Sequence, residues 1–358
     1  MNLTSKTLIA FILLFYGLNA MAQTTRADFK YWTWLTYDQK KKDKEYNKLF
    51  HHLKENGIDA VLINTNGNPD DLEKMAGLAG KEGLEIHAWI MAMNRPGDKV
   101  ALQHPDWYTV SREGKSCYDT RPYVDYYQWL CPTREDSRNH VLSLVKGLAE
   151  VEGVASVHLD YIRFSDIFLP IGLLPKYNLT QNTELPEFDF CYCDVCISEF
   201  EKTHHKNPRE MEHPELDIEW RQFRLNKIKA VVDDAYKIAH DHNKILTAAV
   251  FPYPEMAGRM VRQRWDKWQI DEVLPMVYHN FYNEEIDWIG WVTQQGVNDL
   301  KDTGTGLNTG VFIPSIKPEE MAQVIDQAKQ NGAKGIAFFD ANALTDEHLA
   351  VIKSSKKP

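Results

Sequence analysis

Short apolar runs and longer amphipathic segments alternate along most of the chain. Residues 30–37, "KYWTWLTY", have the aromatic and β-branched character of a strand, and residues 43–57 repeat apolar positions at the spacing of a helix. Further strand-like runs follow at residues 60–66, 85–94, 156–164, 245–253, 272–281, 307–315 and 334–342. Repeated strand–helix units predict an α/β fold with a parallel sheet.

Eight such units in 358 residues predict a (β/α)₈ TIM barrel that forms a single catalytic domain over residues 23–358. The rival architecture is a doubly wound open sheet, which usually has a glycine-rich turn after its first strand. The corresponding stretch here, "TWLTYDQ", contains no glycine. Roughly 50 residues separate the fourth strand from the next long helix, which predicts one long loop that contains cysteines.

The first 22 residues have the pattern of a signal peptide. Lys6 precedes an apolar run from Leu8 to Leu18, and Ala20-Met21-Ala22 form an A-x-A cleavage site before Gln23. The apolar run is too short for a membrane span, and no other stretch of the chain is a transmembrane candidate. We therefore expect an exported, soluble protein that is periplasmic or secreted.

Polar residues gather at the carboxyl ends of the predicted strands, where a barrel places its active face. The fourth strand ends in His158 and Asp160, with Arg163 shortly after. The other strand ends contribute Asn64, Asn66, His87, Trp89, Tyr253, Glu255, Tyr278, His279, Asn280 and Asp340. Recurrence at one end of a barrel predicts a common pocket.

Composition narrows the class of ligand. The net charge is −10, so a nucleic acid partner is not expected, because phosphate binding needs a basic face. The 10 Trp, 16 Tyr and 15 Phe fit either a large core or aromatic platforms for sugar rings. No feature indicates an organic cofactor, and the oligomeric state stays open.

The segment "HLDYIRF", at residues 158–164, and the "WLCP" that begins at residue 129 carry a resemblance. They resemble the glycoside-hydrolase-like barrels of bacterial polysaccharide degradation, loosely over residues 29–345. The resemblance implies a TIM barrel and an oligosaccharide substrate that is hydrolysed at a glycosidic bond. With the Arg and amide side chains of the strand ends, we expect an acidic, uronic-acid-containing substrate.

Asp160 is the first catalytic candidate, because it shares a strand face with His158 and would point into the barrel mouth. Arg163 would orient Asp160 or bind a substrate carboxylate, or it would only brace the loop. Glycosidases normally use two carboxylates, yet the seventh strand, "TGVFIPS", has none. Glu255 and Asp340 are the candidates for the second acid.

Two other functions remain open. An enzyme that binds a terminal uronic acid through Arg and amides, and removes its C5 proton with His or Tyr, would eliminate the C4 substituent. Tyr278, His279 and Asn280 at one strand end fit such a lyase or dehydratase. A barrel that binds glycans without catalysis is the third possibility.

Cys191, Cys193 and Cys196 form a C-x-C-x-x-C cluster in the long loop. Three thiolates this close together favour a structural zinc site, with Cys131 or Cys117 as the fourth ligand. The cluster is similar to the zinc loop of trimeric β-galactosidase barrels. Disulfides, for example Cys117–Cys131, are the alternative in an exported protein.

Overall fold

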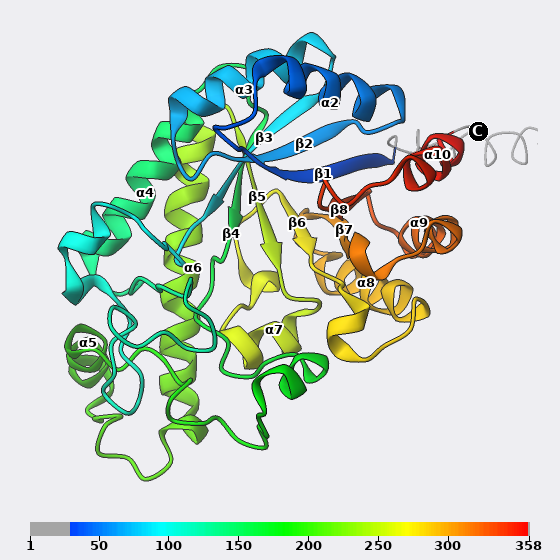
Figure 1. Ribbon diagram of the computed structural model, residues 1–358. Coiled ribbons are helices and arrows are strands. Elements are labelled where there is room, and N and C mark those ends of the chain that lie inside the picture. The colour runs from blue at the N-terminus through cyan, green and yellow to red at the C-terminus, as the bar shows by residue number, and fades with distance from the viewer. Residues whose placement is uncertain (1–28, 357–358) are drawn as a thin grey trace, which may run out of the picture.

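The chain folds into a closed parallel barrel, in the order β1 to β8. The computed structural model describes residues 29–356, so the predicted signal peptide at residues 1–22 lies outside the described part. Figure 1 shows the strands, which are β1 (Lys30–Thr36), β2 (Ala60–Asn64), β3 (Glu85–Met91), β4 (Ser156–Asp160), β5 (Ile245–Val250), β6 (Glu272–Pro275), β7 (Gly306–Phe312) and β8 (Gly335–Phe339). The barrel closes where β1 pairs with β8 in parallel, with Lys30 opposite Gly335. The TIM barrel prediction is confirmed.

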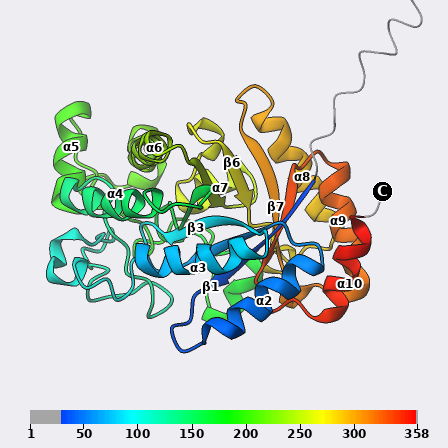
Figure 2. The ribbon, with the colours of Figure 1, turned by 90° about the horizontal axis from the view of Figure 1, so that it is seen from above.

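Helices form an outer layer around the strands (Figures 1 and 2). They are α2 (Asp43–Glu55), α3 (Pro69–Lys81), α4 (Glu135–Ala149), α5 (Asp194–His204), α6 (Ile218–Asp241), α7 (Pro254–Val261), α8 (Asp287–Leu300), α9 (Met321–Gln330) and α10 (Asp346–Ser355). Short 3₁₀ turns complete the loops, namely η1 (Ala101–Gln103), η2 (Pro105–Trp107), η3 (Ile171–Tyr177), η4 (Pro214–Leu216), η5 (Trp265–Lys267), η6 (His279–Tyr282), η7 (Ile313–Ser315) and η8 (Pro318–Glu320). None of the helices in the described part is both long and apolar enough to cross a bilayer.

Aromatic side chains fill the inside of the barrel. Trp32, Trp34 and Trp89 form an interior cluster with small and aliphatic residues from the neighbouring strands. Gly310 on β7 makes room for this packing, because a Cβ there would lie 3.2 Å from the Trp34 ring and 2.8 Å from the Pro275 carbonyl oxygen. The barrel is therefore a packed core that is closed below its carboxyl-end mouth.

The predicted long loop follows β4 and is fixed to the barrel by buried charges. Arg224 of α6 pairs with Asp189 and also donates a 3.0 Å hydrogen bond to the Phe190 carbonyl oxygen. Arg262, just after α7, pairs with Glu184 of the same loop. These pairs connect the loop to two helices, and α5 lies beyond them at the edge of the molecule (Figure 1).

Candidate active site

Asp160 is the last residue of β4, and its carboxylate is held by two donors. The Tyr161 backbone N–H donates to Oδ1 at 2.7 Å, and the Trp89 indole N–H donates to Oδ2 at 3.1 Å. Tyr161 itself has φ +49°, a left-handed conformation that is uncommon for a large side chain. The chain therefore turns sharply after Asp160, and both carboxylate oxygens are fixed at the barrel mouth.

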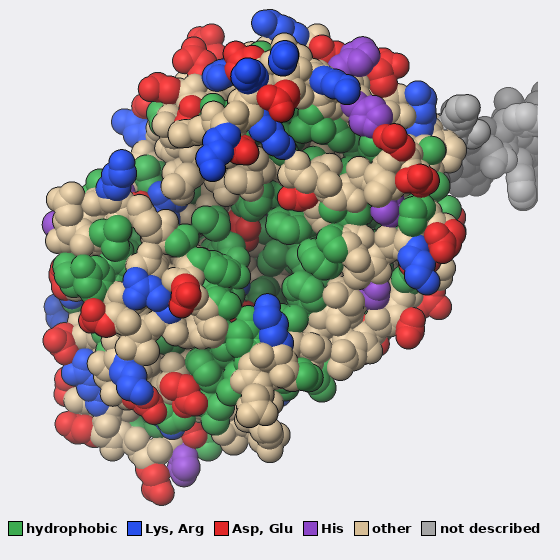
Figure 3. All heavy atoms as spheres, in the orientation of Figure 1, with side chains coloured by type: hydrophobic (Ala, Val, Ile, Leu, Met, Phe, Trp, Pro, Cys, Tyr) green, Lys and Arg blue, Asp and Glu red, His purple; other side chains and the backbone are tan. Residues whose placement is uncertain are grey.

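A cavity of about 350 Å³ opens above Asp160, at the carboxyl ends of the strands. Figure 3 shows the hollow in the middle of this view, with hydrophobic side chains around it. Aromatic rings make most of its wall, contributed by Tyr123, Tyr126, Tyr127, Tyr161, Tyr177, Phe251, Tyr278, Phe281, Tyr282, Phe312 and Phe339. Its charged wall residues are Asp160, Arg163, Asp166 and Lys176. Rings with a few polar groups are typical of sugar-binding sites.

The environment of Asp160 favours its protonated form. The side chain is buried, and this burial raises its pKa to about 6. The Tyr161 N–H, the Arg163 charge and the Trp89 N–H act in the opposite direction, but they compensate for only part of the desolvation. A carboxyl group with this pKa can donate a proton near neutral pH.

Asp166 is a second carboxylate in the same cavity, and its role was not predicted from the sequence. Its Oδ2 accepts hydrogen bonds from the Tyr127 hydroxyl at 2.8 Å and from Arg163 Nη1 at 3.2 Å. Its backbone carbonyl accepts from the Tyr123 hydroxyl at 2.9 Å. The sequence signal was an acid three residues after Arg163, in a loop that has no periodic pattern.

Arg163 braces the loop through Asp166. The guanidinium lies over the rings of Trp129, Tyr161 and Phe251, at 4.8, 5.1 and 4.9 Å from their centroids. It is buried, and the ion pair with Asp166 occupies one of its nitrogens. Of the predicted roles, bracing the loop fits best, while its charge still acts on Asp160.

The two predicted histidines of β3 and β4 lie inside the barrel. His158 accepts from the Trp34 indole N–H at 3.2 Å and contacts Thr247 Oγ1 at 2.8 Å. Burial lowers its pKa well below the usual value, so the ring is neutral. The His87 ring packs against Trp32 in a tilted arrangement, with ring centroids 4.1 Å apart, and forms a 2.6 Å hydrogen bond with Ser156 Oγ. Neither histidine is part of the cavity wall.

Glu255 and Tyr253 lie away from the cavity, on the segment after β5. Glu255 is in the first turn of α7 and faces a separate hollow of about 620 Å³, together with Arg259 and Arg264. Tyr253 packs edge to face on the exposed Trp291 of α8, at a centroid distance of 5.5 Å. This hollow is larger than the cavity at the mouth, but it holds no residue from a strand end of the barrel.

Among the residues after β6, Tyr278 lines the cavity, whereas His279 and Asn280 do not. The Asp160 charge adds to burial in raising the pKa of Tyr278 well above its usual range. Burial lowers the pKa of His279, and nearby Glu320 and Glu285 oppose this shift. Of these three consecutive residues, only Tyr278 can therefore contact a substrate in the cavity.

The remaining candidates shape turns near the mouth. Asn64 Oδ1 accepts from the Asn66 N–H at 2.7 Å, and Asp340 Oδ1 accepts from the Asn342 N–H at 3.0 Å. Both turns follow strands, as predicted, but none of these side chains is part of the cavity wall. Asp340 is near enough for its charge to raise the pKa of Tyr278.

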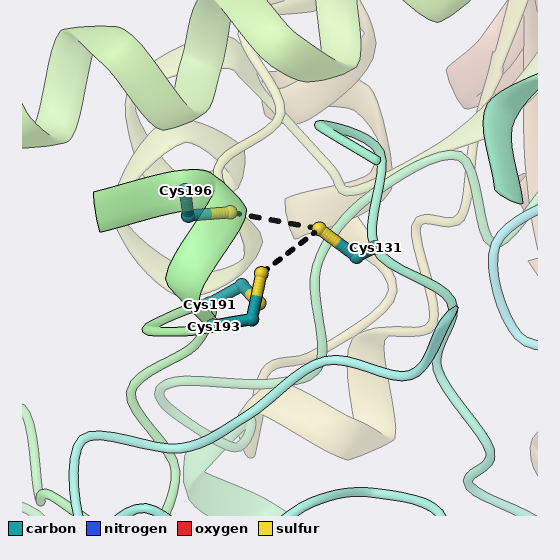
Figure 4. Close-up of side chains that lie close together, drawn as sticks. All are labelled: Cys131, Cys191, Cys193 and Cys196. Atoms are coloured by element: carbon teal, nitrogen blue, oxygen red, sulfur yellow. Dashed lines mark hydrogen bonds between the residues drawn. The ribbon is translucent and has the colours of Figure 1, made fainter. Parts of the chain in front are cut away.

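The loops after β3 and β4 meet at four buried cysteines. Figure 4 shows Cys131 facing Cys193 and Cys196, and Cys191 beside them. All four sulfur atoms lie within 4.8 Å of one another. The Sγ of Cys131 is 3.7 Å from that of Cys193 and 3.5 Å from that of Cys196. A group of four thiols at this spacing can bind a metal ion.

These separations agree with a tetrahedral ion and not with a disulfide. Sulfurs at the Zn–S distance of about 2.3 Å stand about 3.8 Å apart at the corners of a tetrahedron, whereas a disulfide needs about 2.05 Å. The Val110 N–H donates to Cys191 Sγ at 3.3 Å, and Cys193 occupies the N-cap position of α5, next to a helix N-terminus, which favours thiolates. Cys117 is not in the group and accepts from the Thr109 hydroxyl at 3.2 Å.

Similar proteins are found by structure and not by sequence. No family model and no curated protein matches the sequence. By structure, the chain is similar to the catalytic domain of beta-amylase from Paenibacillus polymyxa, with a TM-score of 0.65 and 11% identity over 93% of this chain and 99% of that one. The PgaB (BpsB) glycoside hydrolase domain from Bordetella bronchiseptica has the same score and identity over 90% and 98%.

An endo-beta-1,4-mannanase from Thermotoga petrophila is also similar, with a TM-score of 0.51 and 11% identity over 92% of this chain and 76% of that one. The chain therefore shares the (β/α)₈ barrel fold of these three structures. At 11% identity the likeness establishes the fold alone, so the chemistry rests on the residues of the cavity.

Proposed function

We propose that the protein is a glycoside hydrolase that cleaves oligosaccharides at the mouth of its barrel. The observation that carries this proposal is a pair of carboxylates, Asp160 and Asp166, in the wall of one aromatic cavity. Glycosidases need such a pair, one acting as an acid and the other as a base or nucleophile. Aromatic rings around the pair suit the apolar faces of sugars.

The surroundings of the two carboxylates give them different roles. Burial raises the pKa of Asp160 to about 6, so Asp160 donates its proton to the glycosidic oxygen as the bond breaks. Asp166 is hydrogen-bonded to the Tyr127 hydroxyl and paired with Arg163, and we assign it as the second carboxylate, which stabilises the positive charge developing on the sugar. A water molecule completes the reaction by adding across the broken bond.

A uronic acid substrate and an elimination reaction form the second candidate. Lys176 is an exposed cation in the cavity wall, and Tyr278 lies near Asp160. Lys176 would bind the substrate carboxylate, which Arg163 is less free to do because it is paired with Asp166. Lys176 is thus the one cation of the described cavity wall that is not paired with a carboxylate of the wall. Because a single such cation is weak support for binding a uronic acid, hydrolysis is the better-supported reaction.

Mass spectrometry of a panel of algal and plant oligosaccharides tests both candidates. Hydrolysis adds one water to the products and creates a new reducing end. Elimination leaves a 4,5-unsaturated uronate that absorbs in the ultraviolet. Binding without any product would support the glycan-binding alternative and contradict both enzymatic proposals.

We also propose that the protein is exported and that it binds a structural zinc ion. The predicted cleavage after Ala22 would release a protein that begins at Gln23, which N-terminal sequencing of the exported form can test. Cys131, Cys191, Cys193 and Cys196 would hold a zinc ion that joins the loops after β3 and β4. A site with four protein ligands is closed, so the ion would support the cavity walls and take no part in the reaction.

A further inference from the structure

The loop after β4 packs against the segment after β6 at the cavity. The contact is formed by η3 and η6, and Gly172 lies at its centre. A Cβ on Gly172 would be 2.7 Å from the carbonyl oxygens of both Asn280 and Phe281. Glycine is required here because there is no space for a side chain between the two segments.

The other side of η3 is held by the loop after β3. The Tyr123 ring lies 5.7 Å from the Tyr177 ring and stacks on Phe188 at 4.0 Å. Gln181 Nε2 donates to the Tyr123 hydroxyl at 3.0 Å, and its Oε1 accepts from the Leu169 N–H at 2.8 Å. The segment is therefore fixed to both of its neighbours and forms a wall.

This wall belongs to the cavity. Leu173, Lys176 and Tyr177 of η3 face it, and Phe281 and Tyr282 of η6 continue it on the other side of Gly172. When an enzyme binds an internal sugar of a polysaccharide, the chain continues on both sides of that sugar, so the cavity must be open at two ends. A cavity of about 350 Å³ that is closed between β4 and β6 offers no exit on that side.

We propose that the contact between η3 and η6 makes the cavity a dead end that accepts the terminal sugar of a chain, so that the enzyme is exo-acting. This inference rests on the proposed function and specifies its substrate as the end of an oligosaccharide. The chain end enters past the rim, and the bond to the next sugar lies at Asp160. Each reaction then releases one terminal unit.

The experiment uses an oligosaccharide that the full-length protein cleaves, labelled at its reducing end, with products followed by mass spectrometry from the earliest times. Stepwise loss of single units is expected. Early fragments from internal bonds would overturn the exo mode while leaving the proposed function in place. Absence of cleavage across the whole panel would overturn the proposed function, and the exo mode with it.

The Gly172→Ala variant tests the wall directly. Because its Cβ forces η3 away from η6, we expect kcat/KM for the terminal unit to fall at least tenfold. Gly147→Ala is the matched control, since no atom lies within 4 Å of a Cβ at that position of α4, and its kcat/KM should stay within twofold. Equal kcat/KM values for both variants would overturn the role of the contact. If Gly172→Ala does not fold, the product pattern of the wild type still decides.

Discussion

The indole N–H of Trp89 on β3 donates a 3.1 Å hydrogen bond to the carboxylate of Asp160 at the end of β4. Both residues come from neighbouring strands of the barrel, in which Trp89 is opposite His158 and Met91 is opposite Asp160. Strands are the most rigid support that the fold offers, so the carboxylate has one orientation toward the cavity. The proton affinity of the Asp160 carboxylate can therefore be tested by replacing single residues that contact it.

Replacement of Asp160 with Asn should remove the proton donor and leave the shape of the cavity. We expect kcat to fall by about 10² to 10⁴, the usual contribution of general acid catalysis, with substrate binding retained. Glu255→Gln is the matched control, because Glu255 faces a different hollow, and it should keep wild-type activity. Steady-state kinetics and calorimetric binding measure both effects. An Asp160→Asn enzyme within tenfold of wild type would contradict the assignment.

Replacement of Trp89 with Phe should change the pH dependence of the reaction. The lost hydrogen bond favours the ionised form of Asp160, so its removal raises the pKa further. The loss of kcat/KM at high pH should then move upward by about one pH unit. Trp220→Phe is the control, because Trp220 is a buried tryptophan of α6 that is not part of the cavity wall. An unmoved profile would show that Asp160 is not the group that titrates.

The same pKa predicts a change of stability with pH. The folded-state pKa of Asp160, about 6, lies above the ordinary value of 3.8, so the folded protein binds this proton more tightly than the unfolded chain. This stabilisation is complete below about pH 4 and is lost as the pH rises through 6. Urea unfolding of wild type and Asp160→Asn should diverge by on the order of 3 kcal/mol between pH 4 and 7. Parallel stability curves would contradict the shift.

The buried pair of Arg163 and Asp166 should be important for folding as well as for catalysis. Asp166→Asn leaves the guanidinium buried without its charged partner, which typically costs about 3 to 5 kcal/mol of unfolding free energy. Asp241→Asn is the control, since its pair with Lys237 is on the surface and should contribute nothing measurable. Thermal and urea unfolding measure the difference. Equal losses in both variants would mean that burial does not matter at this pair.

The sequence predicted the barrel because strand and helix periods are local properties. The predicted strands ran past the observed ends, since the polar residues that extended them belong to the loops of the mouth. His158 shows the limit of the pattern. It shares the inward face with Asp160, but two residues along a strand is about 6.6 Å, enough to place it in the packed interior.

Most of the cavity wall could not be predicted in the same way. Asp166, Tyr123 and Tyr278 come from loops after different strands, and their meeting depends on how those loops pack. Glu255 follows β5 closely, yet the first turn of α7 directs it to another hollow. The cysteine spacing was more informative, because three thiols within six residues have little freedom to separate, and only the fourth had to come from a distant loop.

The choice of Cys131 over Cys117 as fourth ligand gives a direct test of the metal site. Both thiols are buried, but only Cys131 lies with Cys191, Cys193 and Cys196. We expect one zinc per purified wild-type chain, loss of the metal with a lowered melting temperature in Cys193→Ser, and full zinc content in Cys117→Ser. Because Cys131 is close in sequence to Trp129, which packs under Arg163, loss of the metal should also weaken substrate binding. Metal analysis by mass spectrometry, thiol titration and melting curves decide, and a metal-free native protein or a Cys117–Cys131 disulfide would refute the site.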